Sequence, residues 1–167
     1  MNSKRALTEG LLSRLKSAFP LKSIPLSSEI VPASSADYPD SANCKEWLGG
    51  KAWDSIEHEY IEKMHMDQSL LTDRAYLYYL PAFLKAAYDA PDGRNAGNLN
   101  NQFDPYKFGE PPSDKVIDKN MVSRFKKLSP LQRKEVVAIL TWKSKSGSPA
   151  GKVHDRVLDW WEKFANE

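Results

Sequence analysis

Cysteine is nearly absent from this sequence of 167 residues, in which Cys44 is the only one. A single cysteine cannot form a disulfide within the chain, and disulfide-rich scaffolds are typical of secreted proteins. We therefore expect a protein of the cytoplasm that is stabilised by a hydrophobic core. A chain of this length can bury such a core as one domain, so we expect a single domain over residues 1–167.

Long hydrophobic runs are missing too. The first twenty residues, MNSKRALTEGLLSRLKSAFP, contain no uninterrupted apolar core of signal-peptide length. No stretch approaches the roughly 20 consecutive apolar residues that span a bilayer. We therefore expect no secretion signal and no membrane partner.

The motifs of familiar catalytic and phosphate-binding sites are absent as well. The sequence contains no G-x-S-x-G nucleophile elbow and no P-loop. His58, Glu62 and His65 are spaced i, i+4 and i+7, so they would share one face of a helix. A structural zinc site needs four ligands, however, and no second ligand pair with convincing spacing is present. We expect no catalytic residue, no metal and no cofactor.

What the sequence does contain is helical periodicity. Apolar residues recur at helical spacing in six segments, namely residues 8–19, 54–64, 72–88, 114–128, 129–147 and 148–164. This pattern predicts a mainly α protein, a compact domain of about five or six helices. Two stretches lack the pattern: residues 25–43 are expected to be extended and linker-like, and residues 91–113 to form a polar loop.

The helix predicted over residues 72–88 is the most apolar segment, within LTDRAYLYYLPAFLKAAYDA. Thr72 suits its N-cap. Apolar side chains cover almost its whole circumference, which is typical of a buried central helix. Pro81 removes one backbone hydrogen bond and predicts a kink. We interpret the tyrosines mainly as core residues, and the alternative is a tyrosine-lined cleft at the kink.

The last third of the chain contains two Ser-Pro dipeptides, each followed by a helical pattern. In SPLQRKEVV, Ser129 is a predicted N-cap, Pro130 occupies the first helical position and Gln132 completes a capping box. SPAGKVHDRVLDWW repeats the same start at Ser148. The two segments predict a C-terminal helical hairpin.

Charge is distributed unevenly along the chain, although the net charge is only +2. Residues 27–73 carry three basic and ten acidic residues, whereas residues 114–167 carry twelve basic and seven acidic ones. The acidic stretch would suit a basic protein partner. Nucleic-acid binders usually concentrate more positive charge than the C-terminal part, where acids are interleaved. The predicted partner-binding residues are Asp54, Glu57, Glu59 and Glu62.

Three motifs between Trp47 and the C-terminus carry a resemblance. They are G-K-x-W in GGKAWDSI, L-T-x-x-A-[FY]-x-Y-Y-L-P-A-[FY]-L in LTDRAYLYYLPAFL, and R-F-x-x-L-[ST]-P-x-Q-[RK] in RFKKLSPLQRKEVV. This combination resembles a family of small bacterial proteins of unknown function. The resemblance implies a compact, mainly helical cytosolic protein and supplies no catalytic residue. Small bacterial proteins of this kind are often immunity proteins against secreted toxins. This is an analogy at the level of the protein class.

The leading hypothesis is therefore a non-enzymatic protein-binding module, most concretely a bacterial immunity protein. Such a protein would neutralise a toxin, here a basic toxin domain, by direct binding. Two alternatives stay open. One is a small enzyme with a tyrosine-lined cleft, and the other is a weak nucleic-acid-binding accessory protein.

Overall fold

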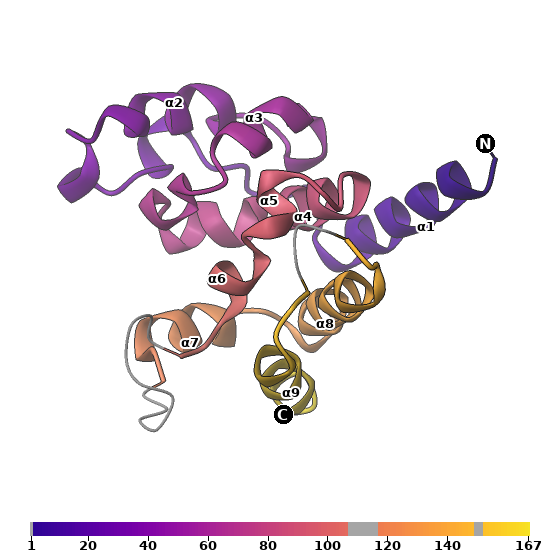
Figure 1. Cartoon of the computed structure of the whole chain (residues 1–167). Helices are drawn as coiled ribbons and strands as arrows, with labels where there is room; N and C mark the ends of the chain where they lie inside the picture. Colours follow the sequence, from indigo (N-terminus) through magenta and orange to yellow (C-terminus); the bar gives the residue numbers. More distant parts are fainter. Residues whose placement is uncertain (1, 107–116, 149–151) are drawn as a thin grey trace.

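The computed structural model describes residues 2–106, 117–148 and 152–167, with side chains from Glu9 onward (Figure 1). Over these ranges the chain forms nine α-helices and no strand, which confirms a mainly α fold. None of these helices is long and apolar enough to cross a bilayer. Residues 107–116 of the predicted loop, and Pro149 of the second Ser-Pro start, lie outside the described residues. The helices are α1 (Asn2–Ala18), α2 (Pro39–Leu48), α3 (His58–Lys63), α4 (Asp73–Asp89), α5 (Arg94–Gly97), α6 (Leu99–Phe103), α7 (Lys119–Lys126), α8 (Pro130–Lys145) and α9 (Asp155–Phe164).

Helix α4 is the central element and contacts α1, α3, α5 and α8. Thr72 caps it as predicted, because its side-chain oxygen accepts a hydrogen bond from Ala75 N at 3.1 Å. Pro81 lies inside the helix and is buried, so packing offsets the missing backbone hydrogen bond. The kink expected at this proline stays a prediction. Figure 1 shows α2 and α3 on one side of α4, with α8 and α9 on the other.

The C-terminal hairpin consists of α8 and α9, which pack against each other. Its first helix starts as predicted: Ser129 Oγ accepts from Gln132 N at 3.3 Å, and Gln132 Oε1 accepts from Ser129 N at 2.8 Å. The second start was predicted wrongly, since α9 begins at Asp155. Ser148 serves another purpose, because its Oγ donates to the carbonyl oxygen of Pro91 at 2.7 Å.

Residues 25–43 are more structured than the sequence predicted. Two short 3-10 helices, Ser27–Glu29 and Ala33–Ser35, precede α2, which starts at Pro39. Proline is favoured at a helix start because its φ angle is already helical and it needs no N–H partner. Ile30 is fully buried, so the segment is docked on the core instead of linking two parts.

Residues 91–113 also contain helices where a loop was predicted. Leu99 and Phe103 of α6 are buried at a spacing of four residues. The helical pattern was hidden because polar residues occupy the other inward positions. Asn95 and Gln102 are both buried, and their side chains hydrogen-bond to each other at 3.3 Å.

Two large core rings have a polar atom that is paired with a backbone carbonyl. Tyr79 Oη of α4 donates to Leu48 O at 2.5 Å, which joins the end of α2 to the central helix. Trp161 Nε1 of α9 donates to Phe103 O at 2.9 Å. The Trp161 ring packs against the rings of Phe103 and Phe125, at centroid distances of 5.6 and 4.7 Å. These contacts join α6, α7 and α9 into one core.

Candidate functional site

The four acids predicted to bind a partner lie along one short segment but in different surroundings. Asp54 forms an ion pair with Lys16 of α1 at 2.7 Å, and Glu59 forms one with Lys63 at 2.5 Å. Glu57 is exposed and has no ion pair in the described part of the chain. The fourth acid is turned inward.

This fourth acid, Glu62, holds the start of α5. Its Oε2 accepts hydrogen bonds from Arg94 N at 2.6 Å and from Asn95 N at 3.4 Å. A Cβ atom added to Gly93 would lie 2.8 Å from both carboxylate oxygens, so the backbone approaches the side chain closely. Glu62 is therefore committed to contacts within the fold.

The spacing of His58, Glu62 and His65 does not assemble a metal site. His65 Nδ1 lies 3.0 Å from the backbone oxygen of Glu62, and His58 Nε2 lies 4.0 Å from its carboxylate. Among the residues that the structure describes, no three His, Cys, Asp or Glu side chains converge as metal ligands.

Acidic charge without a paired cation remains on α2, on the turn before it and on the turns that flank α3. Burial, and to a smaller extent the nearby charge of Asp40, raise the pKa of Asp67. Two large apolar side chains in the same stretches, Tyr38 and Met66, are 59% and 62% exposed. We call the acids of this region that have no ion pair within the described ranges the acidic surface; they are Asp37, Asp40, Glu46, Glu57 and Asp67.

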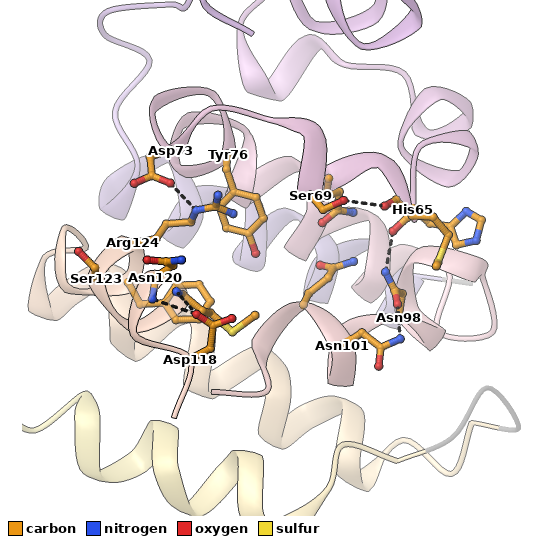
Figure 2. A pocket seen from close by; sticks show the side chains of 15 residues that line it. His65, Ser69, Asp73, Tyr76, Asn98, Asn101, Asp118, Asn120, Ser123 and Arg124 are labelled. Atoms are coloured by element: carbon orange, nitrogen blue, oxygen red, sulfur yellow. Dashed lines mark hydrogen bonds and ion pairs between the residues drawn. The ribbon is translucent and has the colours of Figure 1, made fainter. Parts of the chain in front are cut away.

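A pocket of about 610 Å³ lies where the N-terminal end of α4 meets α7, α6 and the 3-10 helix Asp67–Leu70. In Figure 2, Asp73 and Arg124 lie on one side of it, and His65 and Asn98 on the other. Pockets of this size hold small-molecule ligands in many proteins. We call it the α4–α7 pocket, and none of the four acids predicted to bind a partner lines it.

Three buried amides form a network beside this pocket, and two of them, Gln68 and Gln102, line it. The third, Asn95, donates from Nδ2 to Phe83 O at 2.8 Å. Because a carbonyl can only accept, the side-chain oxygen of Asn95 must face the other way. It accepts from Gln68 Nε2 at 3.0 Å and from Gln102 Nε2 at 3.3 Å. The carbonyl of Phe83 thus fixes which way the oxygen and nitrogen of all three side-chain amides point.

Three buried oxygens of pocket-lining side chains find no hydrogen-bond partner among the described residues. They are Gln68 Oε1, Gln102 Oε1 and Tyr76 Oη. A buried polar group without a partner costs about 1–3 kcal/mol. Native structures leave few such groups, and each calls for an explanation. The α4–α7 pocket is therefore short of hydrogen-bond donors.

The ion pairs at the edge of the pocket are centred on Asp73. Asp73 accepts from Arg124 Nε at 2.7 Å and from Lys127 Nζ at 2.6 Å. Burial opposes the ionisation of Asp73, but the hydrogen bonds from Lys127 and Arg124 outweigh burial and hold its pKa below the ordinary value. The guanidinium of Arg124 also lies 4.6 Å from the ring centre of Tyr76. Burial raises the pKa of Tyr76, so its hydroxyl stays protonated.

The side chains around the pocket do not form a nucleophile paired with a base in the part of the chain that the structure describes. Ser69 donates to the carbonyl oxygen of Met66 and not to a ring nitrogen of His65. Burial raises the pKa of Cys44 to about 12, so the thiol stays protonated at neutral pH. Of the four tyrosines in α4, only Tyr76 lines the pocket, so the pocket is not the tyrosine-lined cleft that the sequence left open as an alternative.

Sequence reasoning missed the residues that build this pocket. Asn95 and Gln102 fell in the predicted polar loop, and Gln68 lay between two predicted helices. A signal was present in the spacing of Leu99 and Phe103, which lie four residues apart as on one helical face. Extending that face by four residues backward reaches Asn95, and Gln102 lies three residues after Leu99.

Comparison with known proteins gives a family and no relative of known function. No curated protein and no solved structure matches the chain. A family match covers residues 33–165, well over half of the chain, and it confirms the expectation of a family whose function is unknown. By this match the chain belongs to a family of unknown function, DUF6714.

Proposed function

We propose that this chain is a non-enzymatic protein-binding module that holds a basic partner through the acidic surface. One observation carries the proposal. Residues 27–73 carry ten acids against three bases, and five of those acids have no ion pair in the described part of the chain. The exposed Tyr38 and Met66 add apolar contact area of the kind that is enriched at protein interfaces.

The segments that carry the acidic surface are hydrogen-bonded to the core. The Tyr79–Leu48 hydrogen bond fixes the end of α2 to α4. Trp53 Nε1 donates to Phe19 O at 3.0 Å and fixes the turn before α3 to the end of α1. A surface that is already ordered loses little conformational entropy on binding. Its local charge would also speed the encounter with an oppositely charged partner.

In its most concrete form, the proposal is a bacterial immunity protein of the cytoplasm that neutralises a basic toxin by direct binding. Covering the active site of a toxin requires a rigid surface of complementary charge and no catalytic residue. The single, buried Cys44 fits a reducing compartment. The net charge of +2 does not oppose the proposal, because the negative charge is local to residues 27–73.

The test is a charge reversal that spares the fold. Its variant changes three exposed acids of the acidic surface without ion pairs, and it leaves Glu62 in place because that side chain holds α5. A control with the same change in charge reverses three exposed acids of the C-terminal segment. The variant is Asp37→Lys with Glu46→Lys and Glu57→Lys, and the control is Asp159→Lys with Glu162→Lys and Glu167→Lys.

The measurement has two stages. The wild-type protein first captures its partner from the source cells, and the association rate of the purified pair is then measured at low and at physiological salt. We expect the variant to associate at least about tenfold more slowly at low salt. The control keeps the wild-type rate. Wild-type association by the variant, or equal slowing by the control, contradicts the proposal.

A further inference from the structure

The two carbonyl acceptors of the α4–α7 pocket have a fixed orientation. Gln68 and Gln102 each donate one N–H to Asn95 Oδ1. Asn95 cannot turn over, because its Nδ2 donates to Phe83 O. Flipping either glutamine amide would place two oxygens against each other and remove a hydrogen bond. Both Oε1 atoms therefore require a donor from outside this amide network.

The rest of the pocket combines one hydroxyl with apolar walls. Tyr76 Oη, also without a partner among the described residues, can donate one hydrogen bond and accept another. Figure 2 shows the Tyr76 side chain extending into the space between α7 and α6. Met66, Met121 and the buried Phe125 supply apolar surface to the lining. Such walls suit a ring or another flat apolar body.

The ionised groups at the pocket sum to zero when Lys127 is included, which pairs with Asp73 but does not itself line the pocket. Arg124 and Lys127 carry two positive charges, and Asp73 and Asp118 carry two negative ones. Asp73 is held by both cations, and Asp118 caps α7 by accepting two backbone hydrogen bonds. A neutral ligand preserves this balance, whereas an ionised ligand would bring in a charge without a partner.

We infer that the α4–α7 pocket binds a neutral small molecule that donates hydrogen bonds, of the carboxamide or amino-heterocycle class. Its N–H groups satisfy Gln68 Oε1 and Gln102 Oε1, its ring lies against the apolar walls, and the Tyr76 hydroxyl accepts or donates a further bond. The three oxygens are closed to solvent before binding. Binding therefore requires each glutamine side chain to rotate enough to expose Oε1 while Nε2 keeps its bond to Asn95 Oδ1.

Three probes of nearly equal shape separate donors from acceptors and charge. Benzamide is neutral and donates, methyl benzoate is neutral and only accepts, and benzamidine donates but is cationic. Each is titrated into ¹⁵N-labelled full-length protein and followed by NMR. We expect benzamide to shift resonances of Gln68, Tyr76 and Gln102, and to bind at least about fivefold more tightly than either other probe, the effect of about one hydrogen bond.

Two variants test the acceptors directly. Gln102→Met removes one acceptor at nearly constant shape, and we expect it to weaken benzamide binding about fivefold and to leave methyl benzoate unaffected. Asn120→Leu is the control, because Asn120 lines the pocket but is exposed. Gln68→Met is measured in the same way in case the first variant does not fold.

Different outcomes test the two parts of the inference, namely that the ligand donates hydrogen bonds and that it is neutral. Equal or tighter binding of methyl benzoate, no shifts at the pocket with any probe, or an ordered water alone on the three oxygens in a crystal soaked with benzamide overturns the donor assignment. Tighter binding of benzamidine overturns the neutral class. None of these outcomes bears on the acidic surface, whose five acids are different residues.

Discussion

Tyr76 and Tyr79 lie one turn apart on α4 and are almost equally buried, at 3% and 0% exposure. Tyr79 Oη donates to Leu48 O and lies 3.0 Å from Lys51 O, whereas Tyr76 Oη has no partner among the described residues. The first hydroxyl joins α2 to the central helix. The second faces a pocket bordered by two amide oxygens that also lack partners. The contrast separates a polar group that holds the fold from polar groups that the proposed ligand would satisfy.

The largest effect should come from the satisfied part of the core. Trp161→Ala removes a fully buried ring that contacts Phe103 and Phe125, and we expect a loss of about 3–5 kcal/mol in the free energy of unfolding. Its neighbour Trp160 is only partly buried, so Trp160→Ala should cost less than half as much. Urea denaturation measures both, and equal losses would contradict the assignment of the core.

The second prediction compares the two tyrosines directly. Tyr79→Phe removes the donor to Leu48 O and should lower the free energy of unfolding by about 1–3 kcal/mol. Tyr76→Phe removes a hydroxyl without a partner and should leave stability unchanged or slightly higher. A destabilisation by Tyr76→Phe as large as that by Tyr79→Phe would show that the Tyr76 hydroxyl is already bonded.

A third comparison concerns two acids that the sequence placed together as partner-binding residues. Glu62→Ala removes hydrogen bonds to Arg94 N and Asn95 N, and we expect a loss of about 1 kcal/mol. Glu57→Ala should change stability by less than about 0.5 kcal/mol, because Glu57 is exposed. Thermal unfolding of both variants checks the difference. Equal stability of the two would place Glu62 on the surface with Glu57.

Much of the fold was predictable because apolar spacing and capping are local properties. Thr72 and the Ser129–Gln132 box were identified correctly, since the capping side chain and its N–H lie within three residues of each other. The start of α9 was not, because the helix begins at Asp155 and Ser148 is held by a contact that is distant in the sequence. The partner in this case, Pro91 O, is 57 residues away.

The site was less predictable than the fold. Polar residues were assigned to loops, whereas Asn95 and Gln102 are core residues held by bonds to other buried amides. The bond from Gln68 to Asn95 spans 27 residues, so no local pattern contains it. The predicted partner-binding acids failed for a different reason. Their charges are visible in the sequence, but the partners of Asp54 and Glu62, which are Lys16 and the backbone N–H of Arg94, come from other parts of the chain.

The smallest predicted effects depend on pH and have opposite signs at the two candidate sites. The pKa of Asp73 is held below its ordinary value of 3.8, because the hydrogen bonds from Lys127 and Arg124 outweigh burial. The native state then binds fewer protons than the unfolded chain. The ion pairs contribute stability above about pH 4, and this contribution is lost as the pH falls through the folded-state pKa. Asp73→Asn should therefore destabilise the protein at neutral pH, by less than about 1 kcal/mol because the side chain is 41% exposed.

For Asp67 of the acidic surface, the pH dependence of stability has the opposite sign. Burial and the charge of Asp40 raise its pKa, so its native state binds more protons than the unfolded chain. Ionised Asp67 therefore weakens the fold at neutral pH. This penalty shrinks as the pH falls through the raised folded-state pKa and is gone below the ordinary aspartate value of 3.8. Asp67→Asn should raise the free energy of unfolding slightly at pH 7 and leave it unchanged near pH 3. Urea denaturation of both variants and the wild type at these two pH values measures the signs. Destabilisation by Asp67→Asn at pH 7 would mean that this carboxylate has a favourable partner, and the acidic surface would then lose one of its five members.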